Sequence, residues 1–101
     1  MPDRRHFITI QRGAQILYLA TNRGKAHETI MDLLIKRGID PQACTVRVSN
    51  LERTGTNRKL HYGALRDLLN GANPMVHEGV DVMHGDEVLY RLQRHHVNGG
   101  E

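Results

Sequence analysis

The stretch FITIQRGAQILYLA, Phe7 to Ala20, decides the fold because apolar residues alternate on both sides of a central glycine. Ile8 and Ile10 alternate with polar residues before Gly13, and apolar residues resume at Ile16. A two-residue period is typical of a half-buried strand, and glycine adopts the positive φ that many tight turns require. The stretch therefore predicts a β-hairpin.

A second stretch, GVDVMHGDEVLYRL from Gly79 to Leu92, has the same pattern 72 residues later. Both stretches read apolar-x-apolar-x-x-Gly-x-x-apolar-Leu-Tyr, and three of their fourteen positions are identical. So few identities fit either an internal duplication or two unrelated hairpins. Under both interpretations, the sequence predicts a second hairpin whose strands are equivalent to those of the first.

Between the hairpins, the periodicity predicts two helices and one strand. The resulting order ββαβαββ predicts an α+β, two-layer domain, in which a five-stranded sheet carries both helices on one face. The expected elements are a helix over residues 25–37 capped by Thr21 or Asn22, a central strand over residues 44–49, and a helix over residues 58–69 capped by Thr56 or Asn57.

The composition predicts one folded domain over residues 1–101, with an ordered core over about residues 6–96 between a polar N-terminus and a glycine-rich tail. Hydrophobic residues make up 39% and charged residues 25%, which is typical of globular rather than disordered chains. No apolar run approaches the length of a membrane span, and the first residues lack the apolar core of a signal peptide. We therefore expect a cytoplasmic protein without membrane contact.

Strand parity separates an expected core face from an expected outer face. The outer face would carry Leu17, Leu19, Leu89 and Arg91, which we interpret as a protein interface and the contact of a possible homodimer. The expected core comprises Ile8, Ile10, Ile16, Tyr18, Ala20, Val80, Val82, Val88, Tyr90 and Leu92 from the strands, and Leu33, Leu34, Leu65 and Leu68 from the helices.

The basic residues suggest a ligand. The formal net charge is +3, and eleven of the fourteen basic residues are arginine, which binds phosphate and carboxylate groups bidentately. Arg23 and Lys25 flank the expected start of the first helix, and Arg53, Arg58 and Lys59 flank that of the second. If the helices run parallel, these loops form one basic edge at helix N-termini, where anions are favoured. The leading hypothesis is a non-enzymatic domain that contacts nucleic-acid phosphates, with RNA preferred over DNA.

Two alternatives remain open. The chain has the size of inhibitors and accessory factors that phages and mobile elements encode, which would bind an acidic protein surface through arginines and the leucine strand face. The other alternative is an enzyme that uses Cys44 or a histidine. We predict no catalytic residue, cofactor or metal site, because His95 and His96 point to opposite faces of a strand and no HxxxH or CxxC pair occurs.

Overall fold

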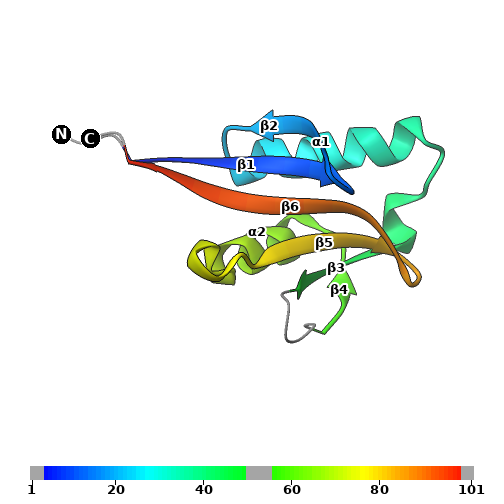
Figure 1. The fold of residues 1–101 in the computed structure, drawn as a ribbon. Helices are drawn as coiled ribbons and strands as arrows, with labels where there is room; N and C mark the ends of the chain where they lie inside the picture. The colour runs from blue at the N-terminus through cyan, green and yellow to red at the C-terminus, as the bar shows by residue number, and fades with distance from the viewer. Residues whose placement is uncertain (1–3, 50–55, 99–101) are drawn as a thin grey trace.

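The computed structural model describes the backbone of residues 4–49 and 56–98. Two helices and six strands alternate along the chain, with a short 3-10 turn before β3 and another before β5 (Figure 1). The elements are β1 (Arg4–Arg12), β2 (Gln15–Ala20), α1 (Arg23–Lys36), η1 (Pro41–Ala43), β3 (Cys44–Ser49), β4 (Arg58–Lys59), α2 (Tyr62–Gly71), η2 (Pro74–Val76), β5 (Gly79–His84) and β6 (Glu87–Asn98).

The fold is α+β, but its antiparallel sheet has six strands rather than the five expected. The strand order is β2-β1-β6-β5-β3-β4, so β6 and β5 occupy the centre and β3, expected there, lies next to one edge. The additional strand is β4, in which Arg58 pairs with Val46 and Lys59 with Thr45. The first described strand, β1, pairs with the last, β6, and both lie inside the sheet rather than at its edges.

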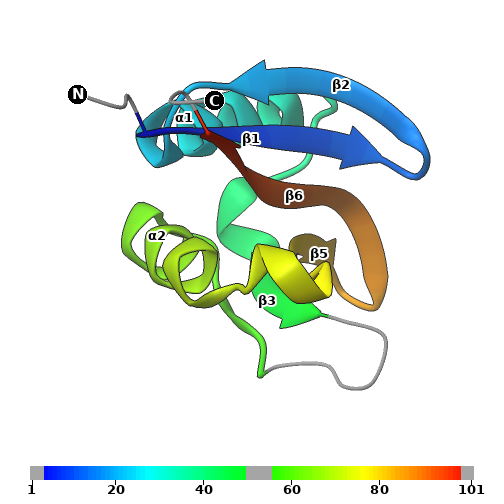
Figure 2. The ribbon, with the colours of Figure 1, turned by 60° about the vertical axis from the view of Figure 1, so that its left-hand side comes forward.

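Both helices contribute to a single core against one face of the sheet (Figure 2). Asn22 caps α1 as expected, and Gly38 beyond its end has a φ of +73°. In the helices, Leu34 and Leu65 are buried as expected, whereas Leu33 and Leu68 are only partly buried. The fully buried helix residues are Ala26, Ile30, Leu34, Ala64, Leu65 and Leu69.

The two predicted hairpins are present and have the same strand register. Ile10 pairs with Tyr18 in the first hairpin, and Val82 pairs with Tyr90 in the second. These four residues are equivalent under the 72-residue offset of the sequence match. The sequence similarity therefore corresponds to the same cross-strand pairing, which confirms that the strands are equivalent.

The turns and irregularities of the hairpins are equivalent as well. Gly13 and Gly85, which have φ angles of +60° and +63°, each lie in the turn. In both hairpins the register shifts by one residue after the tyrosine pair, and this leaves Leu17 and Leu89 without a cross-strand partner. Such a β-bulge reverses the in-and-out alternation on one side of it.

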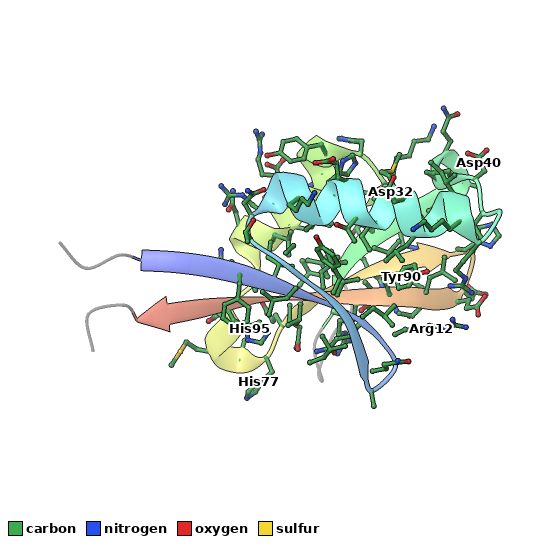
Figure 3. All side chains as sticks on the ribbon, turned by 90° about the horizontal axis from the view of Figure 1, so that it is seen from above. Arg12, Asp32, Asp40, His77, Tyr90 and His95 are labelled. Atoms are coloured by element: carbon green, nitrogen blue, oxygen red, sulfur yellow. The ribbon has the colours of Figure 1, made fainter. Side chains whose placement is uncertain are left out.

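Four strand residues differ from their expected burial, and the bulges account for three of them. Ile16 and Val88 were expected inside, but they are 59% and 45% exposed because they lie beyond the bulge. Leu89 was expected on the outer face, but as the bulge residue it belongs to the core and is 4% exposed. Tyr18 was also expected in the core, yet it is 40% exposed because the tip of the β1–β2 hairpin curls away from α1 (Figure 3).

Helix α2 starts at Tyr62 instead of residue 58, and neither Thr56 nor Asn57 caps it. The backbone before this point is part of the sheet, since the Leu60 amide donates a hydrogen bond to the Cys44 carbonyl (3.2 Å). His61 is the N-cap, and its Nδ1 accepts a hydrogen bond from the Ala64 amide (3.2 Å). Helix α2 therefore begins only after the residues that pair in the sheet.

The α2 assignment predicts unequal contributions from two adjacent leucines. Leu69→Ala should lower the free energy of unfolding by about 2–5 kcal/mol, because it leaves a cavity in the core. Leu68→Ala should cost clearly less, because Leu68 is only partly buried. Chemical denaturation of both variants measures the difference, and a larger loss at Leu68 would show that α2 is rotated from this position.

Candidate nucleic-acid interface

The structure distributes the predicted basic residues differently from the expected edge at two helix N-termini. Arg23 lies at the start of α1, as expected, although the helix begins at Arg23 itself and not at Lys25. Arg58 and Lys59 lie in β4 rather than beside the start of α2. Arg53 falls in residues 50–55, outside the described residues, so the expectation for it stays a prediction.

Arg58 lies close to α2 through a shared carboxylate. The distance from Arg58 Nη2 to Asp67 Oδ2 is 3.8 Å, and that from Arg66 Nε to Asp67 Oδ1 is 3.6 Å. All three side chains are about half exposed, at 44%, 48% and 52% for Arg58, Arg66 and Asp67. Exposed ion pairs of this kind contribute about 0–1 kcal/mol, so both guanidinium groups can exchange this carboxylate for another anion at little cost.

An exposed aromatic ring lies beside these arginines. The Arg66 guanidinium lies 5.7 Å from the centroid of the Tyr62 ring, and that ring is 40% exposed. The His27 ring from α1 meets Tyr62 edge-on, with 5.7 Å between centroids. Tyr62 is therefore held from two sides while part of its ring faces solvent.

Arg23 connects the first turn of α1 to the same region. Its Nη1 donates a hydrogen bond to Asn70 Oδ1 near the end of α2. Contacts thus run from β4 through α2 to α1 without a break. We call Arg23, Arg58, Tyr62 and Arg66 the helix-layer basic surface.

Two of the predicted cations lie apart from this surface. Lys25 is two residues from both Arg23 and His27, which places it about 200° around the helix axis from them. Lys59 follows Arg58 on a strand and points to the opposite face of the sheet. Of the five predicted residues, only Arg23 and Arg58 are seen to contact α2 in the described structure, through Asn70 and Asp67.

Sequence reasoning missed Tyr62 and Arg66. Their spacing of four residues was a usable signal, because side chains at i and i+4 meet on a helix surface and arginine stacks favourably on tyrosine. The expected helix over residues 58–69 already contained this pair, but only cations beside the helix starts were assigned to the basic edge.

The backbone amides at the helix starts are already partly used. The Lys25 amide donates to Asn22 Oδ1 (2.8 Å), and the Ala64 amide donates to His61 Nδ1 (3.2 Å). Each helix therefore satisfies one N-terminal donor with its own cap. The cationic side chains are therefore the candidate anion-binding groups of this region, since each cap reduces the number of free amides at its helix end.

The predicted protein interface is divided by the structure. Leu17 and Leu19 are 37% and 54% exposed, but Leu89 is in the core. Arg91 is not a free contact residue, because its Nε donates to Asp81 Oδ1 (2.9 Å) and its Nη2 to Ser49 Oγ (2.7 Å). Asp81 is 2% exposed, and a buried carboxylate requires such a partner.

Cys44 has the wrong environment for a nucleophile. It is buried, and its Sγ lies 3.6 Å from the Asp40 carbonyl oxygen. Burial, reinforced by the Asp40 carboxylate, raises the pKa of the Cys44 thiol. A reactive cysteine needs a lowered pKa, so the geometry gives no support to catalysis at this residue.

Neither a family model, nor a curated protein, nor a solved structure matches the chain. Within residues 4–49 and 56–98, no group of three or more His, Cys, Asp or Glu side chains is placed to hold a metal ion. In the same residues, no helix combines the length and the hydrophobicity needed to cross a membrane. A proposal of function therefore depends on the surface chemistry alone.

We predict that His27 makes the stability of the domain sensitive to acid. Its Nε2 is buried without a hydrogen-bond partner, and burial, followed by the nearby His61, lowers the pKa of His27 from 6.5. The unfolded chain thus takes up the proton at a higher pH than the folded chain, and this contribution to stability decreases as the pH falls below about 6.5.

The test compares unfolding curves of the wild type and His27→Gln between neutral and mildly acidic pH. We expect the difference between them to shrink or reverse in favour of the variant as the pH falls, since the variant has no proton to take up. A pH dependence that is identical in both proteins would contradict the role of His27.

Proposed function

We propose that this chain is a non-enzymatic domain that binds single-stranded RNA through the helix-layer basic surface. The observation that carries the proposal is the partly exposed ring of Tyr62 with the Arg66 guanidinium over it, on a helix that Arg58 and Arg23 also contact through Asp67 and Asn70. Phosphates would contact Arg23, Arg58 and Arg66, and an unpaired base would stack on Tyr62.

The local chemistry favours phosphate over a weaker anion. Arg58 and Arg66 share a single carboxylate, so two guanidinium groups face one negative charge. A phosphate offers more acceptor oxygens to the forked guanidinium, and it would leave Asp67 with at least one of its arginine partners. The formal net charge of +3 adds a modest attraction over longer range.

A single strand fits this surface better than a duplex does. Proteins recognise RNA sequences mostly at unpaired bases, which they stack on aromatic or guanidinium planes. Tyr62 with Arg66 beside it supplies both kinds of plane within one turn of α2. Stacked bases inside a duplex would not be available to this ring.

Replacing Arg23, Arg58 and Arg66 together by Gln should abolish most of the binding to a short unstructured RNA. The slope of log affinity against log salt concentration should become shallower by roughly one unit for each lost phosphate contact. Fluorescence anisotropy over a salt series measures both effects, and circular dichroism checks that the variant remains folded.

The matched control removes the same charge elsewhere. Arg12, Lys36 and Lys59 are exposed and lie outside the helix-layer basic surface, so their triple change to Gln should weaken binding much less. An equal loss of RNA affinity in the two triple variants would show that binding depends on net charge and not on this surface. Binding that is absent for every nucleic acid, or insensitive to salt, would support an acidic protein partner instead.

Tyr62→Leu tests the stacking contact separately from charge. Loss of one stacked base should weaken binding to single-stranded RNA by about 1–3 kcal/mol and leave the salt slope unchanged. Titration of a perfect RNA duplex with both proteins provides the comparison. A similar loss with the duplex would indicate that Tyr62 only positions Arg66.

A further inference from the structure

Strand β2 is an edge strand of unusual composition. It is the first strand in the sheet order and pairs with β1 alone among the described strands. Its sequence, QILYLA, contains no charge and no proline. Four consecutive large apolar residues are exposed, namely Ile16 (59%), Leu17 (37%), Tyr18 (40%) and Leu19 (54%).

The opposite edge of the sheet has the protection that β2 lacks. Strand β4 consists of two residues, Arg58 and Lys59, and both are exposed. Short length and basic side chains are the usual means by which proteins prevent further strand addition at a sheet edge. The contrast within one sheet indicates that the edge at β2 is open for pairing.

We propose that β2 pairs in an antiparallel arrangement with β2 of a second copy of this chain, so that two sheets join into one across a two-fold axis. Backbone N–H and C=O groups along the free edge of β2 would supply the hydrogen bonds. The second copy would contribute the same uncharged strand. Neither like-charge repulsion nor an unpaired buried charge would then oppose the contact.

A two-fold axis would place apolar side chains of the two β2 strands opposite each other. Cross-strand pairing places Leu19 opposite Thr9 and Ile16 opposite Gln11, on the sheet face away from the helices. A two-fold axis between Leu17 and Tyr18 sets Ile16 of one copy opposite Leu19 of the other on that same face. Cross-strand apolar pairs of this kind stabilise a sheet.

The exposed apolar area of β2 limits the expected affinity of the dimer. The exposed apolar surface of β2 is on the order of a few hundred Å² per copy, well below the roughly 800 Å² per partner of a typical stable interface. We therefore expect a reversible dimer that forms in the micromolar range or above.

The arrangement also places the RNA-binding surfaces. The axis of an antiparallel pair is perpendicular to the sheet, so both α1 helices lie on one side of the joined sheet. Each α1 follows its own β2 closely, and the ends of paired six-residue strands are about 20 Å apart. The two helix-layer basic surfaces would therefore lie on the same side of the joined sheet. Their joint use for RNA rests on the proposed function, whereas the pairing itself does not.

Sedimentation velocity of the nucleic-acid-free protein up to high micromolar concentrations tests the pairing. Wild type should shift from monomer to dimer, and the double change Ile16→Lys and Leu19→Lys should weaken dimerisation by at least about tenfold. The matched control is Ile35→Lys, because Ile35 is 63% exposed but lies on α1. This control should dimerise as the wild type does.

A mixing experiment separates strand pairing from misfolding. The Ile16→Glu and Leu19→Glu variant should also be a monomer, and an equimolar mixture with the lysine variant should restore the dimer, because opposite charges then face each other. A monomeric wild type, an unaffected lysine variant, or a mixture that stays monomeric would overturn the proposal. None of these outcomes depends on RNA binding.

Discussion

The pairing of β1 with β6 is the contact on which the rest of the structure depends. It joins residues 4–11 to residues 91–98 in eight consecutive cross-strand pairs, and it connects two hairpins that are otherwise separated by most of the chain. Ile10 and Leu92 form one of these pairs and are fully buried beneath the helices. We call the eight β1–β6 pairs the seam. Without this pairing, the β1–β2 hairpin would have no third strand, whereas the β5–β6 hairpin would keep β3. Isolated two-stranded hairpins are only marginally stable in water.

The seam also determines which surfaces are available for function. It places β2 at one edge of the sheet and leaves β5 to pair with β3, which in turn carries β4 at the other edge. The helices fill the single face between these edges, and this brings Arg23 to Asn70 and His27 to Tyr62. The basic surface and the open strand edge are therefore two results of one topology.

The sequence predicted the α+β class, both hairpins, α1 with its Asn22 cap, and β3, because the period of each segment matches its element and turn or capping residues mark its ends. It did not predict the bulges at Leu17 and Leu89, because a one-residue insertion leaves no trace in an apolar-Leu-Tyr run that is apolar throughout. The start of α2 was wrong for a different reason. Arg58 and Lys59 are good helix formers, and only the tertiary pairing with β3 places them in a strand. At the candidate site, the strand changes the neighbour of Arg58. Its guanidinium contacts Asp67, whereas a helix that began at residue 58 would have set Arg58 beside Tyr62.

Native-state hydrogen exchange, followed residue by residue by NMR, tests the seam most directly. If the β1–β6 pairing holds the hairpins together, the amides that bridge the two strands should be among the slowest to exchange and should open only with global unfolding. Backbone amides of β4, a two-residue strand at the edge, should exchange much faster. The result that would contradict this account is rapid exchange throughout β1 while β3 and β5 stay protected, because the first hairpin would then be a separable unit and not part of one sheet.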